Sequence, residues 1–267
     1  MSFLSLPEPY SFELSTERFR AFGTDLANRW HDGALWRWLG GREVRISAAD
    51  GGVEVEPFAA EARVLLGAAF DLDAFYAFAA TEPVLAGLVE PLRGFRPPLA
   101  PSAFEMLVGA ITAQQVSLHA ATAIRNRMLE AYGEPGAVAI RFPTQQELAA
   151  AASDGELFAL GFSRRKAEYV LALARAVIDW DELAALPDDE VKSRLTALRG
   201  IGEWTADWFL GRHLARPRAW PAGDLALRKA LARFYPELAS DPRAAGERFA
   251  PFENLAAHYL LLAARTP

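Results

Sequence analysis

The chain is 267 residues long, 52% of its residues are hydrophobic, and none is cysteine. These values predict one to three compact units with a large buried core, and they exclude disulfides, cysteine-ligated zinc and a cysteine-ligated iron–sulfur cluster. The formal net charge of −6 argues against a nucleic-acid partner unless positive charge is concentrated in one segment.

The chain carries no pattern of membrane insertion or export. It has no run of about 18 apolar residues, and its N-terminus lacks the charged and apolar regions of a signal peptide. We therefore expect a cytoplasmic protein with no membrane partner, and the absence of cysteine agrees with a reducing compartment. The histidines are too scattered to indicate a metal site: His31, His119, His213 and His258.

Residues 1–88 have the pattern of a small α+β domain. Segments rich in β-branched or aromatic residues predict the strands of an antiparallel sheet, at 10–14, 34–39, 43–47, 53–58 and 63–66. Glycine-containing turns at 40–41 and 50–52 separate several of these strands. Helical spacing of apolar residues predicts helices at 16–31 and 72–89.

A proline-rich linker at 91–101 leads into a helical region that we assign to residues 89–267. Ser102 and Glu105 have the spacing of a capping box, and a helix follows to about residue 111. A second helix is predicted at 117–132. The two are interrupted at 113–117, where Gln114 and Gln115 lie; from the residues alone, this break is an exposed kink.

More helices are predicted along the rest of the chain, at 144–151, 154–160, 163–177, 181–198, 204–214 and 225–234, with a last one beginning at Pro251 and Phe252. The helix at 163–177 has Arg164, Arg165 and Lys166 in its first turn. Positive charge there opposes the helix dipole, so we expect a compensating group outside the helix, either a phosphate or solvent.

Residues 198–202 predict a hairpin between two helices. Gly200 and Gly202, separated by one apolar residue, allow positive φ angles and close approach of a ligand to the backbone. The amides of Gly200, Gly202 and Glu203 are then open at a helix N-terminus, which favours a phosphate. A tight interhelical turn is the alternative. Residues 191–233 contain nine basic and three acidic residues, so positive charge does gather here.

After the hairpin come Trp204, Thr205 and Trp208, and then a loop that ends in Pro221, Gly223 and Asp224. The segments GIGEWTADW and WPAGDLALRKAL together resemble the helix-hairpin-helix (HhH-GPD) DNA glycosylases, most closely those of the 3-methyladenine DNA glycosylase II (AlkA) type. Arg199 and Glu203 depart from the commonest pattern of this family. Neither residue removes a backbone amide, although an acid beside a phosphate site would weaken binding.

The resemblance implies a fold and a set of site residues. The fold is α+β, with the antiparallel-sheet domain followed by a mainly helical core of two lobes and a cleft between them. The break at Gln114 and Gln115 carries the wedge that enters the duplex where a base has left. DNA contacts are implied for the remaining hairpin positions, which are Arg199, Gly200, Gly202, Glu203 and Thr205. A monovalent cation, Na⁺ or K⁺, is implied for three backbone carbonyls, those of Thr196, Leu198 and Ile201.

Asp224 is the predicted catalytic residue. It opens a helix and so suits an N-cap, but a fixed carboxylate also stabilises the positive charge that develops on the sugar when an N-glycosidic bond breaks. A pocket for an electron-poor, flipped base favours aromatic faces, and we assign Trp204, Trp208 and, from its place before the last helix, Phe252. Aromatic residues at helical spacing can equally be core.

The sequence therefore predicts a glycosylase that excises alkylated bases such as 3-methyladenine from double-stranded DNA and leaves an abasic site. Relatives that also cut the backbone carry a lysine at the position of Trp204, so monofunctional action is implied. We expect a monomer that requires no cofactor. The alternatives are a related glycosylase for deaminated or oxidised bases and a non-enzymatic helix-hairpin-helix DNA-binding protein.

Overall fold

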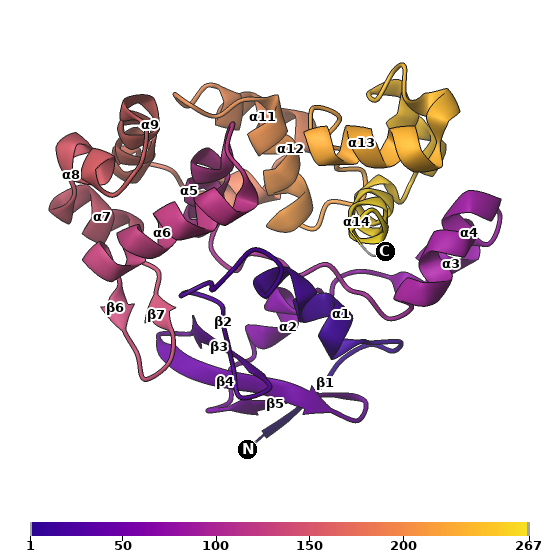
Figure 1. Cartoon of the computed structure of the whole chain (residues 1–267), viewed down its shortest axis with the longest axis horizontal. Coiled ribbons are helices and arrows are strands. Elements are labelled where there is room, and N and C mark those ends of the chain that lie inside the picture. Colours follow the sequence, from indigo (N-terminus) through magenta and orange to yellow (C-terminus); the bar gives the residue numbers. More distant parts are fainter. Residues whose placement is uncertain (1, 266–267) are drawn as a thin grey trace.

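A computed structural model describes residues 2–265, and its N-terminal part is a five-stranded antiparallel sheet (Figure 1). The strand order is β1-β5-β4-β3-β2. Gly40 and Gly41 have φ angles of 54° and 75°, which permit the tight reversal between β3 and β4. The bounds are β1 Ser2–Ser5, β2 Arg29–His31, β3 Ala34–Leu39, β4 Arg42–Ala49 and β5 Gly52–Glu56.

The sheet buries alternate residues of its strands in a core shared with two short helices, α1 (Phe12–Thr16) and α2 (Ala62–Leu65). Alternation places every second side chain on the same face, so this core is continuous across the strands. Its fully buried members from the central strands are Leu35, Val44, Ile46, Val53 and Val55. The predicted α+β class with an antiparallel N-terminal sheet is confirmed.

Several predicted elements of this part are wrong. The strands predicted at 10–14 and 63–66 are α1 and α2. Ser11 caps α1 by accepting the Leu14 amide at 3.3 Å, and Ala62 and Leu65, three residues apart, are the buried positions of α2, which is a helical spacing. β1 and β2 were not predicted.

The helix predicted at 16–31 is also wrong. After the end of α1, this segment forms a 3-10 turn, η1 (Glu17–Phe19), a loop, and the strand β2. The Asp25 carboxylate accepts the amides of Ala27 and Asn28 at 3.0 and 3.1 Å, and this local bonding competes with a helical backbone.

The predicted helix at 72–89 is two helices, α3 (Leu72–Ala79) and α4 (Pro83–Val89). Pro83 has no N–H and occupies the first turn of α4, so the helix restarts there. A 3-10 turn, η2 (Glu90–Leu92), leads into the predicted linker. That linker is buried rather than exposed: Arg96 is 1% exposed, and Leu99 donates its amide to Leu65 O at 3.0 Å.

The rest of the described chain is mostly helical, as predicted, and Figure 1 shows it arching over the sheet. The predicted helix at 181–198 is divided, and a short hairpin, β6–β7, was not predicted. The bounds are α5 Ala103–Ala113, α6 Leu118–Tyr132, β6 Glu134–Pro135, β7 Ile140–Arg141, α7 Gln145–Ala151, α8 Asp154–Ala159, α9 Arg164–Arg175, α10 Trp180–Ala185, α11 Asp188–Thr196, α12 Glu203–Arg212, α13 Leu225–Phe234, η3 Pro236–Leu238, η4 Ala244–Phe249 and α14 Glu253–Ala263.

Two hydrophobic clusters divide the helices. The first contains buried residues of the helices from α5 through α12. The second contains buried residues of α3, α4, α13 and α14. Residues 72–89 thus share a core with the C-terminal helices, while the division of the chain at residue 88 stays a prediction. Ser102 caps α5, but the Glu105 carboxylate binds Arg37 at 2.6 Å instead of completing a capping box.

Candidate active site

A hairpin of residues 197–202 connects α11 to α12 and requires glycine at one position. Gly200 has a φ of 89°, and a Cβ atom there would overlap the ring of Tyr169 on α9. Gln114, the C-cap of α5, donates from Nε2 to Gly200 O at 2.9 Å. The side-chain amide of Gln114 therefore stabilises the hairpin. The sequence predicted a DNA contact for Gln114 and did not indicate this role.

Gly202 has a different role from the one predicted. Its φ of −104° and ψ of 178° are extended, so the predicted positive φ is wrong, and the chain turns at Gly200 instead. No atom lies within 4 Å of a Cβ atom built on Gly202. Gly202 caps α12 without any side-chain bond, so amides of the first turn are open to an anion that approaches from this side.

The other predicted DNA-binding positions of the hairpin are paired or buried. Arg199 binds Glu168 at 2.7 Å, and Glu203 binds Arg243 at 2.7 Å. This Arg243 hydrogen bond and charge lower the pKa of Glu203 and offset the negative charge beside the open amides. Thr205 is 1% exposed, so its side chain packs inside the protein.

The predicted wedge position is exposed at a sharp turn. Gln115 has a φ of 55°, which is the left-handed region, and it lies between α5 and α6. Val116 and Leu118 beside it are apolar but 40% and 43% exposed. Polar and apolar side chains therefore project together from this turn, and the apolar pair was not predicted.

Asp224 is the N-cap of α13, and both of its carboxylate oxygens are hydrogen-bonded. Oδ1 accepts the amides of Ala226 and Leu227 at 2.9 and 3.0 Å. Oδ2 accepts the indole N–H groups of Trp204 and Trp208, each at 2.9 Å. Burial raises the pKa of Asp224, but the bonds from Trp204, Leu227 and Trp208 and the charge of Arg212 outweigh it, so the pKa is lowered. The group is a fixed anion at neutral pH.

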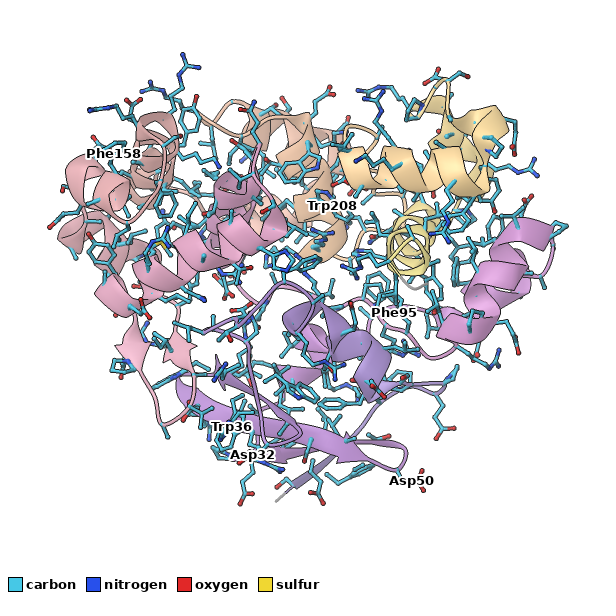
Figure 2. All side chains as sticks on the ribbon, viewed as in Figure 1. Asp32, Trp36, Asp50, Phe95, Phe158 and Trp208 are labelled. Carbon is cyan, nitrogen blue, oxygen red and sulfur yellow. The ribbon has the colours of Figure 1, made fainter. Side chains whose placement is uncertain are left out.

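The Asp224 carboxylate lines a cavity of about 480 Å³ together with Trp204 and Trp208. The two tryptophans lie one helical turn apart on α12, and Figure 2 shows Trp208 toward the middle of the helical part. The opposite walls come from α5, α6, α14 and residues 17–28. The cavity is large enough to hold a nucleobase.

Residues 25–37, α5 and α6 contribute one wall of the cavity. Charged and polar side chains form a hydrogen-bonded network along this wall. Arg125 donates to Asp25 Oδ2 at 2.6 Å, and Asn28 donates to the same oxygen at 3.0 Å. Arg37 donates to Asn28 Oδ1 and, at 2.6 Å, to Glu105 Oε2. Sequence reasoning missed this wall because no local pattern brings these segments together.

Phe252 is not at the cavity, contrary to the prediction. Its ring centroid lies 5.9 Å from that of Phe75 and 5.4 Å from that of Phe78. It is the N-cap of α14 and packs in the second helical cluster, because α3 occupies the side of α14 on which it lies.

With this geometry described, comparisons with known proteins are informative. Residues 108–251, more than half of the chain, match the model of the HhH-GPD superfamily base excision DNA repair protein. The chain belongs to this superfamily. The match begins within α5 and includes the hairpin and Asp224.

Similar proteins agree with the membership. The 3-methyladenine DNA glycosylase of Archaeoglobus fulgidus has a similar structure, with a TM-score of 0.89 and 27% identity, over 100% of this chain and 99% of that one. The Schizosaccharomyces pombe 3-methyladenine DNA glycosylase, in complex with abasic DNA, has a TM-score of 0.61 and 28% identity, over 71% and 95%. A DNA-3-methyladenine glycosylase of Bacillus subtilis is 28% identical over 165 residues, 59% of this chain, and the match spans only about half (54%) of that relative's length.

In this superfamily member, five of the nine basic residues near the hairpin are paired with acids. Besides Arg199, four basic residues of the segment 191–233 are in ion pairs: Lys192 with Asp207, Arg194 with Glu182, Arg216 with Asp188, and Arg218 with Glu247 and Glu253. Arg228 and Lys229 are exposed on α13 and have no acidic partner among the described residues. α13 therefore carries positive charge directly after Asp224.

The predicted compensation for the first turn of α9 is inside the protein. Lys166 donates to Thr112 O at 2.8 Å, near the C-terminal end of α5, where helix carbonyls lack partners and favour a cation. Arg164 lies over the ring of Phe158 at 4.8 Å. Neither a phosphate nor solvent is required to explain Lys166.

Arg212 and His258 also line the cavity and were not predicted. The Arg212 guanidinium lies 3.4 Å from the centroid of the Trp208 ring. Burial lowers the pKa of His258 well below its usual value, so this imidazole is neutral at pH 7. The spacing of Trp204, Trp208 and Arg212, each four residues apart on one helix, was the available signal for Arg212.

The carbonyls predicted to hold a monovalent cation lie at the C-terminal end of α11 and in the turn. Leu198 O accepts the amide of Ile201 at 3.1 Å, and Thr196 ends the helix. Carbonyls at a helix C-terminus lack intrahelical donors, carry partial negative charge and are hard oxygen ligands, so they suit such an ion. In residues 2–265 no group of three or more His, Asp or Glu side chains is placed to hold a metal ion, and no helix could span a membrane.

Proposed function

We propose that the chain is a monofunctional DNA glycosylase that excises alkylated bases, such as 3-methyladenine, from duplex DNA and leaves an abasic site. The observation that carries this proposal is the fixed anion of Asp224, which lies in a base-sized cavity next to two indoles and follows a hairpin with open amides. The names of the similar 3-methyladenine glycosylases support the same substrate class.

Binding would begin at the hairpin. A DNA phosphate would lie against the amides at Gly202, where nothing blocks its approach, and Gln115 would enter the space that the flipped base leaves in the duplex. Positive charge on Arg228 and Lys229 of α13 would draw the same strand toward Asp224.

Chemistry would follow from the position and charge of the Asp224 carboxylate. As the C1′–N bond breaks, its electron pair leaves with the base and positive charge develops at C1′, where the carboxylate stabilises it. Water then adds to C1′ and loses a proton, which completes hydrolysis. A base that is already cationic leaves as a neutral molecule and needs no acid. The indole bonds keep Asp224 ionised throughout.

An Asp224→Asn variant tests the assignment. It retains a side-chain oxygen for the cap of α13 but loses the charge, and loss of one such electrostatic interaction lowers a rate by at least about 100-fold. We expect normal DNA affinity and a single-turnover rate of 3-methyladenine release reduced by that factor. Near-normal release by the variant would remove Asp224 from the reaction, and no release by the unaltered protein would refute the glycosylase itself.

We also infer that the carbonyls of Thr196, Leu198 and Ile201 would hold a sodium or potassium ion between the hairpin and a DNA phosphate. The support is the exposed C-terminal end of α11 in this chain. DNA affinity measured in potassium chloride and in tetramethylammonium chloride of equal concentration tests this, because tetramethylammonium cannot fit among carbonyl oxygens. Equal affinities would exclude the ion.

A further inference from the structure

The first turn of α9 carries two arginines that no acid in the protein compensates. Lys166, the third basic residue of this turn, donates to Thr112 O. Arg164 and Arg165 are exposed, and among residues 2–265 neither has a carboxylate oxygen within 4.0 Å. Positive charge is unfavourable at the N-terminus of a helix, because the helix dipole is positive there. The free protein therefore keeps these two charges at a loss of stability, which an anionic partner would offset.

A third cation lies beside this turn. Arg127 of α6 donates from Nε to Leu160 O at 2.6 Å, in the loop that leads into α9, and it has no acidic partner in the described part of the chain. Figure 2 shows nitrogen-tipped side chains that project from this end of the molecule, near Phe158. In a chain with 34 acidic and 28 basic residues, three neighbouring cations without acids form a distinct positive patch. We call Arg127, Arg164 and Arg165 the α9 patch.

The α9 patch adjoins the hairpin that we assign to DNA binding. Tyr169 of α9 lies so close to Gly200 that a Cβ atom at this glycine would overlap its ring, and Glu168 pairs with Arg199 at 2.7 Å. Arg165 is three residues before Glu168 and four before Tyr169, so it lies on the same face of α9, one turn nearer the N-terminus. A duplex that lies on the hairpin therefore comes close to Arg165 as well.

The arrangement of α5, α9 and α12 indicates which strand of the duplex would reach the patch. α5 contacts both α9 and α12, and Figure 1 shows it between them. The turn after α5 carries Gln115, and α12 carries the tryptophans that bind Asp224. When Gln115 enters the duplex, the strand with the flipped base lies on the Asp224 side of this turn. The complementary strand then lies on the α9 side.

We propose that the α9 patch is a second DNA-binding site, which binds phosphates of the strand complementary to the damaged one. This inference rests on the proposed glycosylase function. Exposed guanidinium groups suit phosphate oxygens because they can donate two parallel hydrogen bonds, and contacts to the backbone are independent of base sequence. The hairpin and α13 hold the damaged strand, so the patch holds the other strand in place while the base is outside the duplex.

The first test measures the affinity for a duplex that contains tetrahydrofuran, a stable analogue of an abasic site, over a range of potassium chloride concentrations. Arg165→Gln is compared with the unaltered protein and with Arg175→Gln. Arg175 is the matched control, since it is an exposed arginine in the last turn of the same helix, about 15 Å farther along the axis.

We expect Arg165→Gln to weaken binding roughly five- to tenfold in 0.1 M salt and to reduce the slope of log K against log salt by about 0.9, as for loss of one phosphate contact. The double variant Arg164→Gln/Arg165→Gln should reduce the slope by about twice as much. The thermal midpoint without DNA should not fall, because the lost charge opposed the helix dipole. Unchanged affinity in Arg165→Gln, or an equal loss in Arg175→Gln, overturns the proposal.

The second test identifies the strand. Phosphates near the lesion are replaced with uncharged methylphosphonates, either in the complementary strand or in the damaged strand, and the coupling to Arg165→Gln is measured by a double-mutant cycle. We expect the effect of Arg165→Gln to disappear with the modified complementary strand and to persist with the modified damaged strand. Coupling to the damaged strand, or to neither strand, overturns the proposal.

These measurements are separate from the test of the proposed function, because tetrahydrofuran has no base to release. If the protein shows the expected coupling but releases no 3-methyladenine, the glycosylase function fails and the α9 patch stands. If it releases 3-methyladenine without any coupling, the function stands and the α9 patch fails.

Discussion

Asp224 accepts four hydrogen bonds, and each pair of donors has a separate consequence. The amides of Ala226 and Leu227 fix the carboxylate as the N-cap of α13, whereas the indoles of Trp204 and Trp208 orient its second oxygen in the cavity. An N-cap and a reactive anion are often alternative explanations for one aspartate. Here the cap uses one oxygen atom and the indoles bind the other, so the N-cap does not exclude the proposed role as a reactive anion.

Removal of an indole donor should change the pH dependence of catalysis. The Asp224 pKa is lowered, so activity is present above that pKa and is lost as the pH falls through it. Trp204→Phe removes one donor and raises the pKa, and the acid limb of the rate profile should therefore move to higher pH. Loss of a charge-assisted bond worth about 1.5 kcal/mol predicts roughly a tenfold fall in rate on that limb.

Single-turnover rates from neutral pH down to below the ordinary aspartate pKa of about 3.9 provide the measurement, because the acid limb of the unaltered protein lies below that value. Trp208→Phe should shift the limb in the same direction, because its bond has the same length of 2.9 Å. An acid limb that stays in place in both variants, while the plateau rate falls, would mean that the indoles act by packing alone.

At the scale of elements, substitution of Gly200 should lower the stability of the fold, whereas substitution of Gly202 should lower the affinity for DNA. Gly200→Ala places a Cβ atom at positive φ against the Tyr169 ring, and we expect a loss of about 1–3 kcal/mol in the free energy of unfolding. A Cβ atom at Gly202 has no atom of the protein within 4 Å, so we use Gly202→Val as the second variant. It should leave the thermal midpoint nearly unchanged but lower the affinity for damaged and undamaged duplexes alike, since valine obstructs the phosphate.

Thermal denaturation and equilibrium binding distinguish the two cases. If Gly202→Val bound both duplexes as tightly as the unaltered protein, the hairpin would be a turn and no more. If Gly200→Ala were as stable as the parent, the close packing with Tyr169 would be unimportant.

The turn between α5 and α6 is the second element with a separable role. Gln115 is exposed at positive φ, and a side chain that fills the vacated space in the duplex slows the return of a flipped base. Gln115→Ala should therefore slow excision most for a well-paired lesion, by about tenfold if flipping costs a few kcal/mol. Rates for one lesion opposite its normal partner and opposite an abasic site test this, and equal losses would exclude Gln115 as the wedge.

For the whole molecule, the number and positions of the lysines limit which residue could act as an amine nucleophile. The chain has only three lysines, Lys166, Lys192 and Lys229. Lys166 donates to Thr112 O and Lys192 pairs with Asp207, which leaves Lys229 at the cavity. The resemblance of the hairpin motif implies that Trp204 occupies the position where relatives that cut the backbone carry a nucleophilic lysine.

We therefore expect no imine with the abasic product, and borohydride should trap no covalent complex on denaturing electrophoresis. A glycosylase that forms a Schiff base with its product serves as the positive control. A trapped adduct that disappears in Lys229→Arg would identify that lysine as a nucleophile and would contradict monofunctional action.

Local patterns were sufficient for the elements whose signals lie within a few residues. The helix at 225–234, the interruption at 113–117, the hairpin and the Asp224 cap were all predicted, since caps, glycines and apolar spacing act over single turns. The same reasoning wrongly predicted a helix at 16–31, where the Asp25 side chain accepts backbone amides. It also wrongly predicted a positive φ at Gly202, because Gly200 alone makes the turn.

Only the tertiary structure decided how the cavity is built. Asp25, Arg37, Arg125, Arg212 and His258 come from segments far apart in the chain, and burial and mutual distance determine which of their charges cancel. Phe252 was placed at the pocket by its position before α14, yet it packs against α3. The sequence by itself determined the family motif and the carboxylate that we propose as catalytic, because these depend on neighbouring residues. The charge and shape of the cavity depend on long-range packing, which no local pattern encodes.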